Sequence, residues 1–234
     1  SIAYLYSFLL GGKGVLNCSG KTFFSYFQNS PHLLNVGYRK GVGEMNLSSG
    51  TIEMGRYGVM IGSGVMLGDP FTRTEGVDPC CATGVVRVSG GKLQGNGQGN
   101  CIQTGVFGFC VGFGAWIESG KYGYGDFWYG RLELSGGSVD SGSGGSAGTF
   151  VIGAGQGEGD VAQTGGALSH SGVLNYDSKT YQQPFVIGLF GGEGRYVISN
   201  GTASVQNRMF VGGATAADLD HGASPLNTRT CTDR

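Results

Sequence analysis

Charged residues and strong helix formers are scarce in this sequence. Only 13% of its 234 residues are charged, whereas 49 are glycine. Each glycine inside a helix costs about 1 kcal/mol relative to alanine, so few windows could form a stable helix. This composition disfavours helical folds, and the glycines predict frequent turns.

The sequence also has no long apolar run and no cluster of basic residues. Its longest apolar stretch, from Ile2 to Leu10, is roughly half of the ~20 residues that a membrane-spanning helix needs. The net charge is -1, and no block of lysine or arginine would attract nucleic acid or an anionic membrane surface. We therefore expect neither a membrane span nor a nucleic-acid partner.

The apolar residues that are present exclude a disordered chain. Hydrophobic residues make up 39% of the sequence and include 13 Phe and 11 Tyr, far more apolar surface than a solvated linker carries. The chain must therefore pack a core. A repeating architecture can do so, because each unit needs only its neighbours.

A two-part phrase recurs along the chain: a short apolar strand ending in glycine, followed 13 residues later by the glycine of a Ser-x-Gly-like turn. Gly153 and Gly166 form one such pair. We expect these glycines to be the corners of a coiled chain, where a positive φ lets the backbone turn without a Cβ clash. The glycines of complete and partial phrases are Gly37, Gly50, Gly62, Gly91, Gly120, Gly137, Gly153, Gly166, Gly188, Gly201 and Gly212.

The spacing of the phrases predicts coils of about 25 residues, since Gly62 follows Gly37 by 25 residues and Gly212 follows Gly188 by 24. Such short strands find backbone partners when successive coils stack about 4.8 Å apart. Alternation such as Val86-Arg87-Val88 places one apolar face inward. The sequence therefore predicts an all-β fold, a single-stranded right-handed parallel β-helix.

Four of the phrases, LELSGGSV, VRVSGGKL, TFVIGAGQGEG and YVISNGTASV, resemble the repeats of bacterial extracellular parallel β-helix proteins, especially autotransporter passengers. The resemblance covers about residues 33–213. It implies a β-helix displayed outside the cell. It implies no single function, because that superfamily includes adhesins, stalks and polysaccharide lyases.

The chain divides into three expected segments. Residues 33–213 form the solenoid, and residues 214–234 a tail or cap. Residues 1–32 lack the repeat phrase and are rich in aromatic residues. Because the terminal coils of a solenoid expose unpaired backbone, this first segment is expected either to cap the end or to take part in head-to-tail assembly.

Six cysteines are present without a CxxC pair or a histidine at metal-ligand spacing: Cys18, Cys80, Cys81, Cys101, Cys110 and Cys231. We expect disulfides and an oxidising, extracellular location, with free buried thiols as the alternative. Cys101 and Cys110 could form a local bridge. About seven coils would separate Cys18 from Cys231, so these two would pair only between chains.

Aromatic residues gather among glycines in KYGYGDFWYG, residues 121–130. They are Tyr122, Tyr124, Phe127, Trp128 and Tyr129. Aromatic platforms bind sugar rings and partner surfaces, so this group is a candidate contact surface, for example for surface glycans. The alternative is that the rings pack in the core.

No motif for catalysis or a cofactor stands out. The glycines of residues 150–157 are similar to the opening of a dinucleotide fingerprint, but the residues that follow cannot form the helix that the motif requires. Isolated GYGD and GEGD sequences could hold one calcium ion but not a stacked array. The acidic residues and histidines are scattered: Asp126, Glu133, Asp140, Glu158, Asp160, Asp177, His32, His170 and His221. We expect no catalytic residue, cofactor or metal site.

Stacked coils make a stiff rod, which suits an appendage. The sequence therefore predicts an extracellular structural protein, a solenoid protomer of a surface fibre or layer that assembles head-to-tail with copies of itself. A β-helix adhesin or carbohydrate-binding surface protein is the first alternative. A polysaccharide-active β-helix enzyme is the second.

Overall fold

The fold is taken from a computed structural model. It describes residues 13–20, 22–25, 34–38, 41–54, 58–63, 82–95, 108–113, 115–118, 121–124, 128–142, 148–155, 157–176, 179–189 and 191–212. Regular structure within these ranges consists of β-strands. None of these residues belongs to a helix long and apolar enough to cross a membrane.

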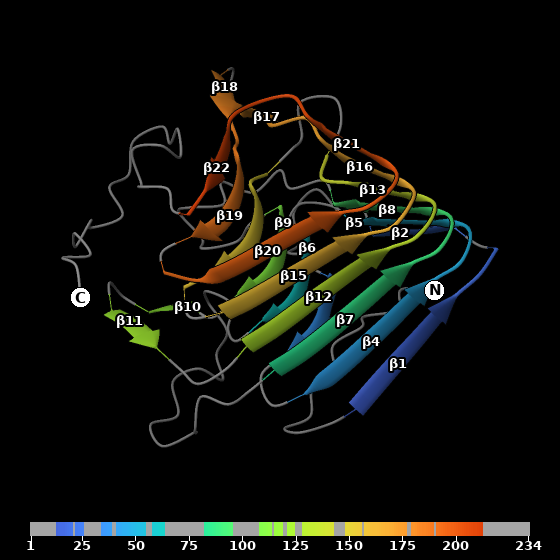
Figure 1. Ribbon diagram of the computed structural model, residues 1–234. Coiled ribbons are helices and arrows are strands. Elements are labelled where there is room, and N and C mark those ends of the chain that lie inside the picture. Colours follow the sequence, from blue (N-terminus) through green and yellow to red (C-terminus); the bar gives the residue numbers. More distant parts are fainter. Residues whose placement is uncertain are drawn as a thin grey trace.

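Most of the strands form three parallel sheets of six strands each (Figure 1). Sheet A contains, in spatial order, β1 (Lys13–Cys18), β4 (Val42–Leu47), β7 (Ala82–Val88), β12 (Trp128–Leu134), β15 (Gly157–Gln163) and β20 (Glu193–Ile198). Sheet B contains β2 (Thr22–Ser25), β5 (Thr51–Met54), β8 (Lys92–Gly95), β13 (Ser138–Asp140), β16 (Ala167–His170) and β21 (Thr202–Val205). Sheet C contains β3 (Leu34–Tyr38), β6 (Val59–Ser63), β9 (Phe109–Phe113), β14 (Phe150–Ala154), β19 (Phe185–Leu189) and β22 (Met209–Val211).

The chain visits sheets A, B and C in the same order six times, and we call each such triplet of strands a coil, numbered 1 to 6 along the chain. Every strand of a coil pairs in parallel with the equivalent strand of the next coil. The expected all-β class is therefore confirmed. The arrangement is consistent with a parallel β-solenoid.

Two antiparallel hairpins interrupt the coils. One, between β9 and β12, consists of β10 (Ala115–Glu118) and β11 (Lys121–Tyr124). The other, between β16 and β19, consists of β17 (Val173–Tyr176) and β18 (Lys179–Gln182). The flanking strands keep their parallel partners, so the hairpins lengthen the connections without shifting the register of the sheets.

The number of residues per coil is not constant. The expected step of 25 holds from Leu34 to its partner Val59 in sheet C. In sheet A, by contrast, the step from Thr83 to Tyr129 spans 46 residues. Paired strands fix only their own positions, and the chain between them can take any length that closes the gap. The period of about 25 residues therefore describes only the shortest steps.

Two rows of glycines mark the corners that the sequence predicted. The first row lies in sheet C, at the position of Gly153 and Gly188, and the second in the turn between sheets A and B. All of them have positive φ. The first row is Gly37, Gly62, Gly112, Gly153, Gly188 and Gly212, and the second is Gly50, Gly91, Gly137, Gly166 and Gly201. Gly120 lies outside the described residues.

A third row of glycines, in sheet A, was not recognised in the sequence, and we call it the glycine column. Its members are Gly14, Gly43, Gly84, Gly130, Gly159 and Gly194, which pair with one another from coil to coil. A Cβ on Gly130 would lie 2.2 Å from the carbonyl oxygen of Ile61. Glycine is required there because sheets A and C approach each other backbone to backbone.

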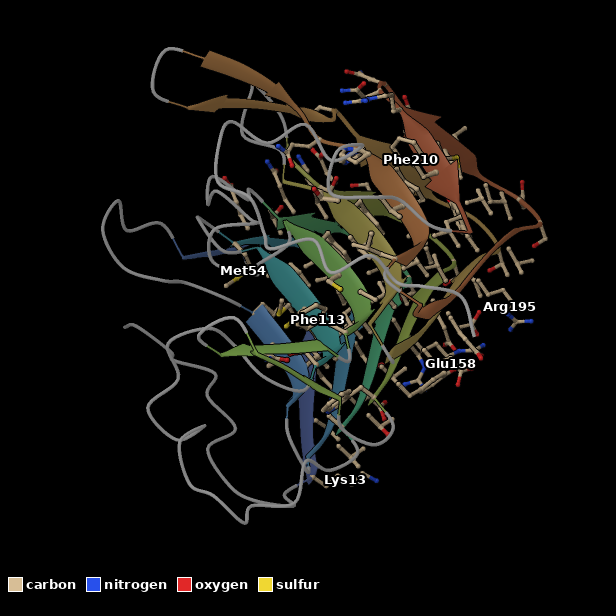
Figure 2. All side chains as sticks on the ribbon, turned by 90° about the vertical axis from the view of Figure 1, so that its left-hand side faces the viewer. Lys13, Met54, Phe113, Glu158, Arg195 and Phe210 are labelled. Atoms are coloured by element: carbon tan, nitrogen blue, oxygen red, sulfur yellow. The ribbon has the colours of Figure 1, made fainter. Side chains whose placement is uncertain are left out.

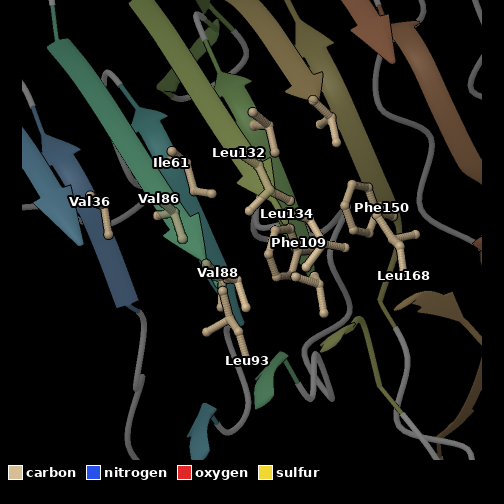
Figure 3. Close-up of a cluster of buried hydrophobic side chains, with 14 of the residues drawn as sticks. Val36, Ile61, Val86, Val88, Leu93, Phe109, Leu132, Leu134, Phe150 and Leu168 are labelled. Atoms are coloured by element: carbon tan, nitrogen blue, oxygen red, sulfur yellow. The ribbon is translucent and has the colours of Figure 1, made fainter. Parts of the chain in front are cut away.

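The core lies between the sheets and is built from columns of identical or similar side chains (Figure 3). Phe109, Phe150 and Phe185 occupy one column, and their stacked rings have centroids 4.7 Å apart. Complete burial of each such side chain stabilises the fold by roughly 1.5–3 kcal/mol. Every coil thus contributes to one continuous core.

The first strands of sheets A and B lie within residues 1–32, the segment expected to be a cap. Both β1 and β2 pair in parallel with strands of coil 2. The parallel sheets therefore already include residues from Lys13 onward, within the segment expected to be a cap. Residues 214–234 lie outside the described part of the chain.

Candidate interaction surfaces

The outer face of sheet A carries a continuous row of ion pairs, which we call the charge ladder. Its members are Glu44, Arg87, Glu133, Arg131, Asp160 and Arg195. Successive members approach to between 2.6 and 3.0 Å. The ladder joins five coils. Its three acidic and three basic groups balance, so the ladder itself carries no net charge.

The ladder perturbs the ionisation of its own members. The pKa of Glu44 is lowered, first by a hydrogen bond from Asn46 and then by the charge of Arg87. Hydrogen bonds from Arg131 to Tyr129 and to Glu133 raise the pKa of Arg131. Asp160 likewise raises the pKa of Arg195. Each of these three shifts favours the charged form of the residue concerned, Glu44, Arg131 or Arg195.

The structure assigns partners to several acidic residues that the sequence left scattered. Glu133 and Asp160 share Arg131 within the ladder. Asp140 forms an ion pair with Lys92, in which Oδ2 and Nζ are 3.3 Å apart. Glu158 lies on the same outer face, opposite Tyr129 on one side and Glu193 on the other. Asp126 and Asp177 lie outside the described residues.

His170 forms a buried polar pair with Ser141 at the end of sheet B. Ser141 Oγ lies 2.5 Å from His170 Nδ1, and His170 Nε2 donates to the carbonyl oxygen of Gln183 at 2.9 Å. Nδ1 therefore accepts a hydrogen bond from the Ser141 hydroxyl, and both ring nitrogens of the neutral imidazole are satisfied. The edge of the ring also contacts Phe150 and Phe185.

This Ser–His pair is a structural feature of the core. Both side chains are fully buried, so a substrate has no route to the Ser141 hydroxyl. Burial lowers the pKa of His170, in keeping with a neutral ring. Among the described residues, no three His, Cys, Asp or Glu side chains are grouped in a way that could hold a metal ion. His32 and His221 lie outside the described part of the chain.

The aromatic group of residues 121–130 does not form one surface. Trp128 is only 2% exposed, and it lies on the inward face of β12 with Leu132 and Leu134. Tyr129, the next residue, is partly exposed beside Arg131. Trp128 is therefore a core residue, which corrects its place in the candidate contact surface. Tyr122 and Tyr124 belong to β11, and Phe127 lies outside the described residues.

Two of the six cysteines are described, and both are free thiols. Cys110 is fully buried in β9, and burial raises its pKa. Cys18 is partly buried at the end of β1, and burial raises its pKa also. Cys110 is therefore a buried free thiol, which was the alternative to the expected local bridge with Cys101. Cys80, Cys81, Cys101 and Cys231 lie outside the described residues.

The core is open at coil 6. Ile198, Met209 and Val211 continue inward-facing columns of sheets A and C, yet they are 48%, 47% and 72% exposed. Their counterparts one coil earlier, Gln163, Phe185 and Ile187, are buried. Strands β20, β21 and β22 are also the last strands of their sheets. Within the described part of the chain, coil 6 thus presents both apolar side chains and strand edges that no further strand pairs with.

In coil 1 the strand of sheet A is more accessible than the strand of sheet C. In β3 the inward side chains of Leu34 and Val36 are buried. In β1, by contrast, Leu16 and Cys18 are only partly buried although they pack on the same core. Lys13 stands exposed at the start of β1, at the opposite end of the stack from Phe210 of coil 6 (Figure 2).

The chain matches no protein-family model, no curated protein and no solved structure with which it was compared.

Proposed function

We propose that this protein is an extracellular structural protomer, a single-stranded right-handed parallel β-helix whose copies stack end to end into a surface fibre or layer. The observation that carries the proposal is the open end of the core at coil 6. There, Ile198, Met209 and Val211 continue buried columns into solvent. Exposed apolar side chains beside unpaired strands form a surface that another strand layer can extend.

The character of the remaining surface supports a structural role. The charge ladder is electrically balanced, so these six residues have little attraction for a charged polymer. The His170 and Ser141 pair is sealed in the core. A glycan-binding role has weaker support, because Trp128 points inward and is only 2% exposed.

Electron microscopy of the purified chain, with sedimentation velocity over a range of concentrations, tests the proposal. We expect linear particles that lengthen with concentration. Substitution of Val211→Lys together with Ile198→Lys places two charges on the open end and should leave monomers with an unchanged β-sheet circular dichroism spectrum. Thr164→Lys, on an exposed turn of coil 5, is the matched control and should assemble normally. Isolated wild-type particles at every concentration would contradict the proposal.

A further inference from the structure

We propose that the end-to-end contact has a defined register, in which β20 of one copy pairs in parallel with β1 of a second copy so that Glu193 lies opposite Lys13 and Gly194 opposite Gly14. This inference rests on the proposed function and names its partner surface. The occupant of the open end is thus a second copy of this chain, joined through sheet A.

The register follows from the pairing inside the chain. One outward column of sheet A begins at Lys13, which pairs with Val42, and ends at Glu193, which pairs with Glu158. The columns stay aligned across all five strand pairs of sheet A. A seventh strand in the same register would therefore place Lys13 of the next copy beside Glu193.

Charge complementarity favours this neighbour. Glu158 and Glu193 are directly opposite each other on adjacent strands, and like charges in such positions repel. Glu193 is exposed, and among the described strands none follows β20 in sheet A. A lysine on the next strand would compensate the paired carboxylates at the junction. Figure 2 shows Glu158 at the coil 5 and 6 end of this face and Lys13 at the other.

The glycine column supplies a second, steric argument. At Gly194 an added Cβ would lie 2.2 Å from the carbonyl oxygen of Ile152, two coils earlier, and 2.6 Å from the nitrogen of Gly188, one coil earlier. The same contacts recur at Gly84, Gly130 and Gly159. At Gly14 an added Cβ would meet nothing within 4 Å. Contacts within the described residues therefore give no reason for glycine at this position.

A preceding copy would provide the missing contact. In the proposed register, coils 5 and 6 of that copy are the two coils before Gly14. The carbonyl oxygen of its Ile187 and the nitrogen of its Gly212 then take the places that Ile152 and Gly188 occupy around Gly194. Gly212 fits this arrangement, because it too has nothing within 4 Å of an added Cβ, although its φ is +82°.

The core columns are compatible with the same register. Leu16 of the second copy would follow Tyr196, and its Cys18 would follow Ile198. All four side chains lie on the inward face of sheet A and are partly or largely exposed in the single chain. Pairing would remove apolar surface from water at both ends at once.

The substitution Gly14→Ala separates assembly from folding. Because the added methyl group meets nothing inside the chain, the midpoint of thermal unfolding of the monomer should not fall. Assembly should be lost, because the methyl group would be driven into the backbone of the preceding copy. Sedimentation velocity at matched concentrations measures the loss. Gly194→Ala is the comparison, since its methyl group clashes within the chain and should lower the unfolding midpoint itself.

A charge exchange tests the register independently. Lys13→Glu and Glu193→Lys should each weaken self-association by roughly tenfold, and the double variant should recover most of the wild-type affinity. Ser204→Lys places a charge on the same coil outside this column and should leave association unchanged. Sedimentation equilibrium at low salt measures the self-association constant of each variant.

The outcomes distinguish the register from the proposed function. If the wild type assembles but Gly14→Ala assembles equally well and the charge exchange has no effect, the register is wrong and end-to-end stacking stands. If the wild type remains monomeric, both are wrong, and a preceding coil of the same polypeptide becomes the better explanation for Gly14. Loss of assembly in Gly14→Ala, together with recovery of self-association in the double charge variant, supports both the register and the proposed function.

Discussion

The hydroxyl of Tyr196 on coil 6 donates a 2.6 Å hydrogen bond to Oε1 of Gln163 on coil 5. The amide nitrogen of Gln163 donates in turn to the carbonyl oxygens of Thr202 at 2.9 Å and Gly166 at 3.2 Å. Gln163 stands in an inward column whose other members are Cys18, Leu47, Val88, Leu134 and Ile198. A polar side chain in an otherwise apolar column thus ties the last two coils together.

Replacing Gln163 by leucine should destabilise the protein. The substitution leaves the Tyr196 hydroxyl and the Thr202 carbonyl without their partner, which costs roughly 1–3 kcal/mol of unfolding free energy. Burial already raises the pKa of Tyr196 to about 12, in keeping with a poorly hydrated hydroxyl. Urea denaturation measures the loss. Tyr196→Phe added to Gln163→Leu should cost little more, and strictly additive losses would show that the two side chains do not interact.

Asp160→Asn should be the most damaging single change in the charge ladder. Its side chain is only 6% exposed and receives hydrogen bonds from both Arg131 and Arg195. Loss of its charge should lower the unfolding free energy by roughly 2 kcal/mol. Glu44→Gln, at a position where the side chain is 32% exposed, is the matched control and should have a smaller effect that disappears at about 1 M salt. Equal effects of the two variants would contradict the role of burial.

Stability should fall as the pH drops from 7 towards 5.5, partly because of His170. Burial lowers its pKa in the folded protein, so the unfolded chain binds a proton first. The neutral His170 ring contributes fully to the unfolding free energy above the pKa of histidine in the unfolded chain, about 6.5. This contribution is lost as the pH falls from there towards the lower pKa of His170 in the folded protein. His170→Gln should flatten this part of the stability profile in urea titrations. An unchanged slope would mean that other groups cause it.

Cys110 should be recovered as an unreactive free thiol. It is completely buried and its pKa is raised, so little thiolate is present to react. Alkylation of the native protein, followed by peptide mass spectrometry, should leave Cys110 unmodified, whereas alkylation in 6 M guanidinium chloride should modify it without prior reduction. Modification only after reduction would instead establish a disulfide and restore the expected bridge to a second cysteine.

The corners of the fold could be predicted because they depend on local geometry. The Val-Ile-Gly phrases at Gly153 and Gly188 reflect a positive φ that glycine adopts without strain, so each copy carries its own signal. The alternation around Val86 and Val88 likewise reports the inward face directly. Both signals survive changes in the length of the intervening chain.

The charge ladder and the glycine column could not be predicted, because they depend on pairing between coils of unequal length. Asp160 pairs with Arg131 across 29 residues and with Arg195 across 35. No fixed period in the sequence aligns these three residues. The sequence could have placed Trp128 in the core, because it is an even number of residues from Leu132 and Leu134 on one strand and therefore lies on the same face. Its glycine-rich and aromatic surroundings suggested a surface instead.

The two inserted hairpins have a consequence for how this protein can be engineered. Coil 5 carries β17 and β18 between β16 and β19, whereas coil 4 connects β13 to β14 without such an insertion. Both coils nevertheless keep their strand partners. A foreign peptide grafted between Gly142 and Gly148, which leaves the buried side chains of Ser141 and Thr149 in place, should therefore be tolerated, at a position along the stack that the sheets fix. Several different peptides could be displayed at chosen intervals along one rigid scaffold.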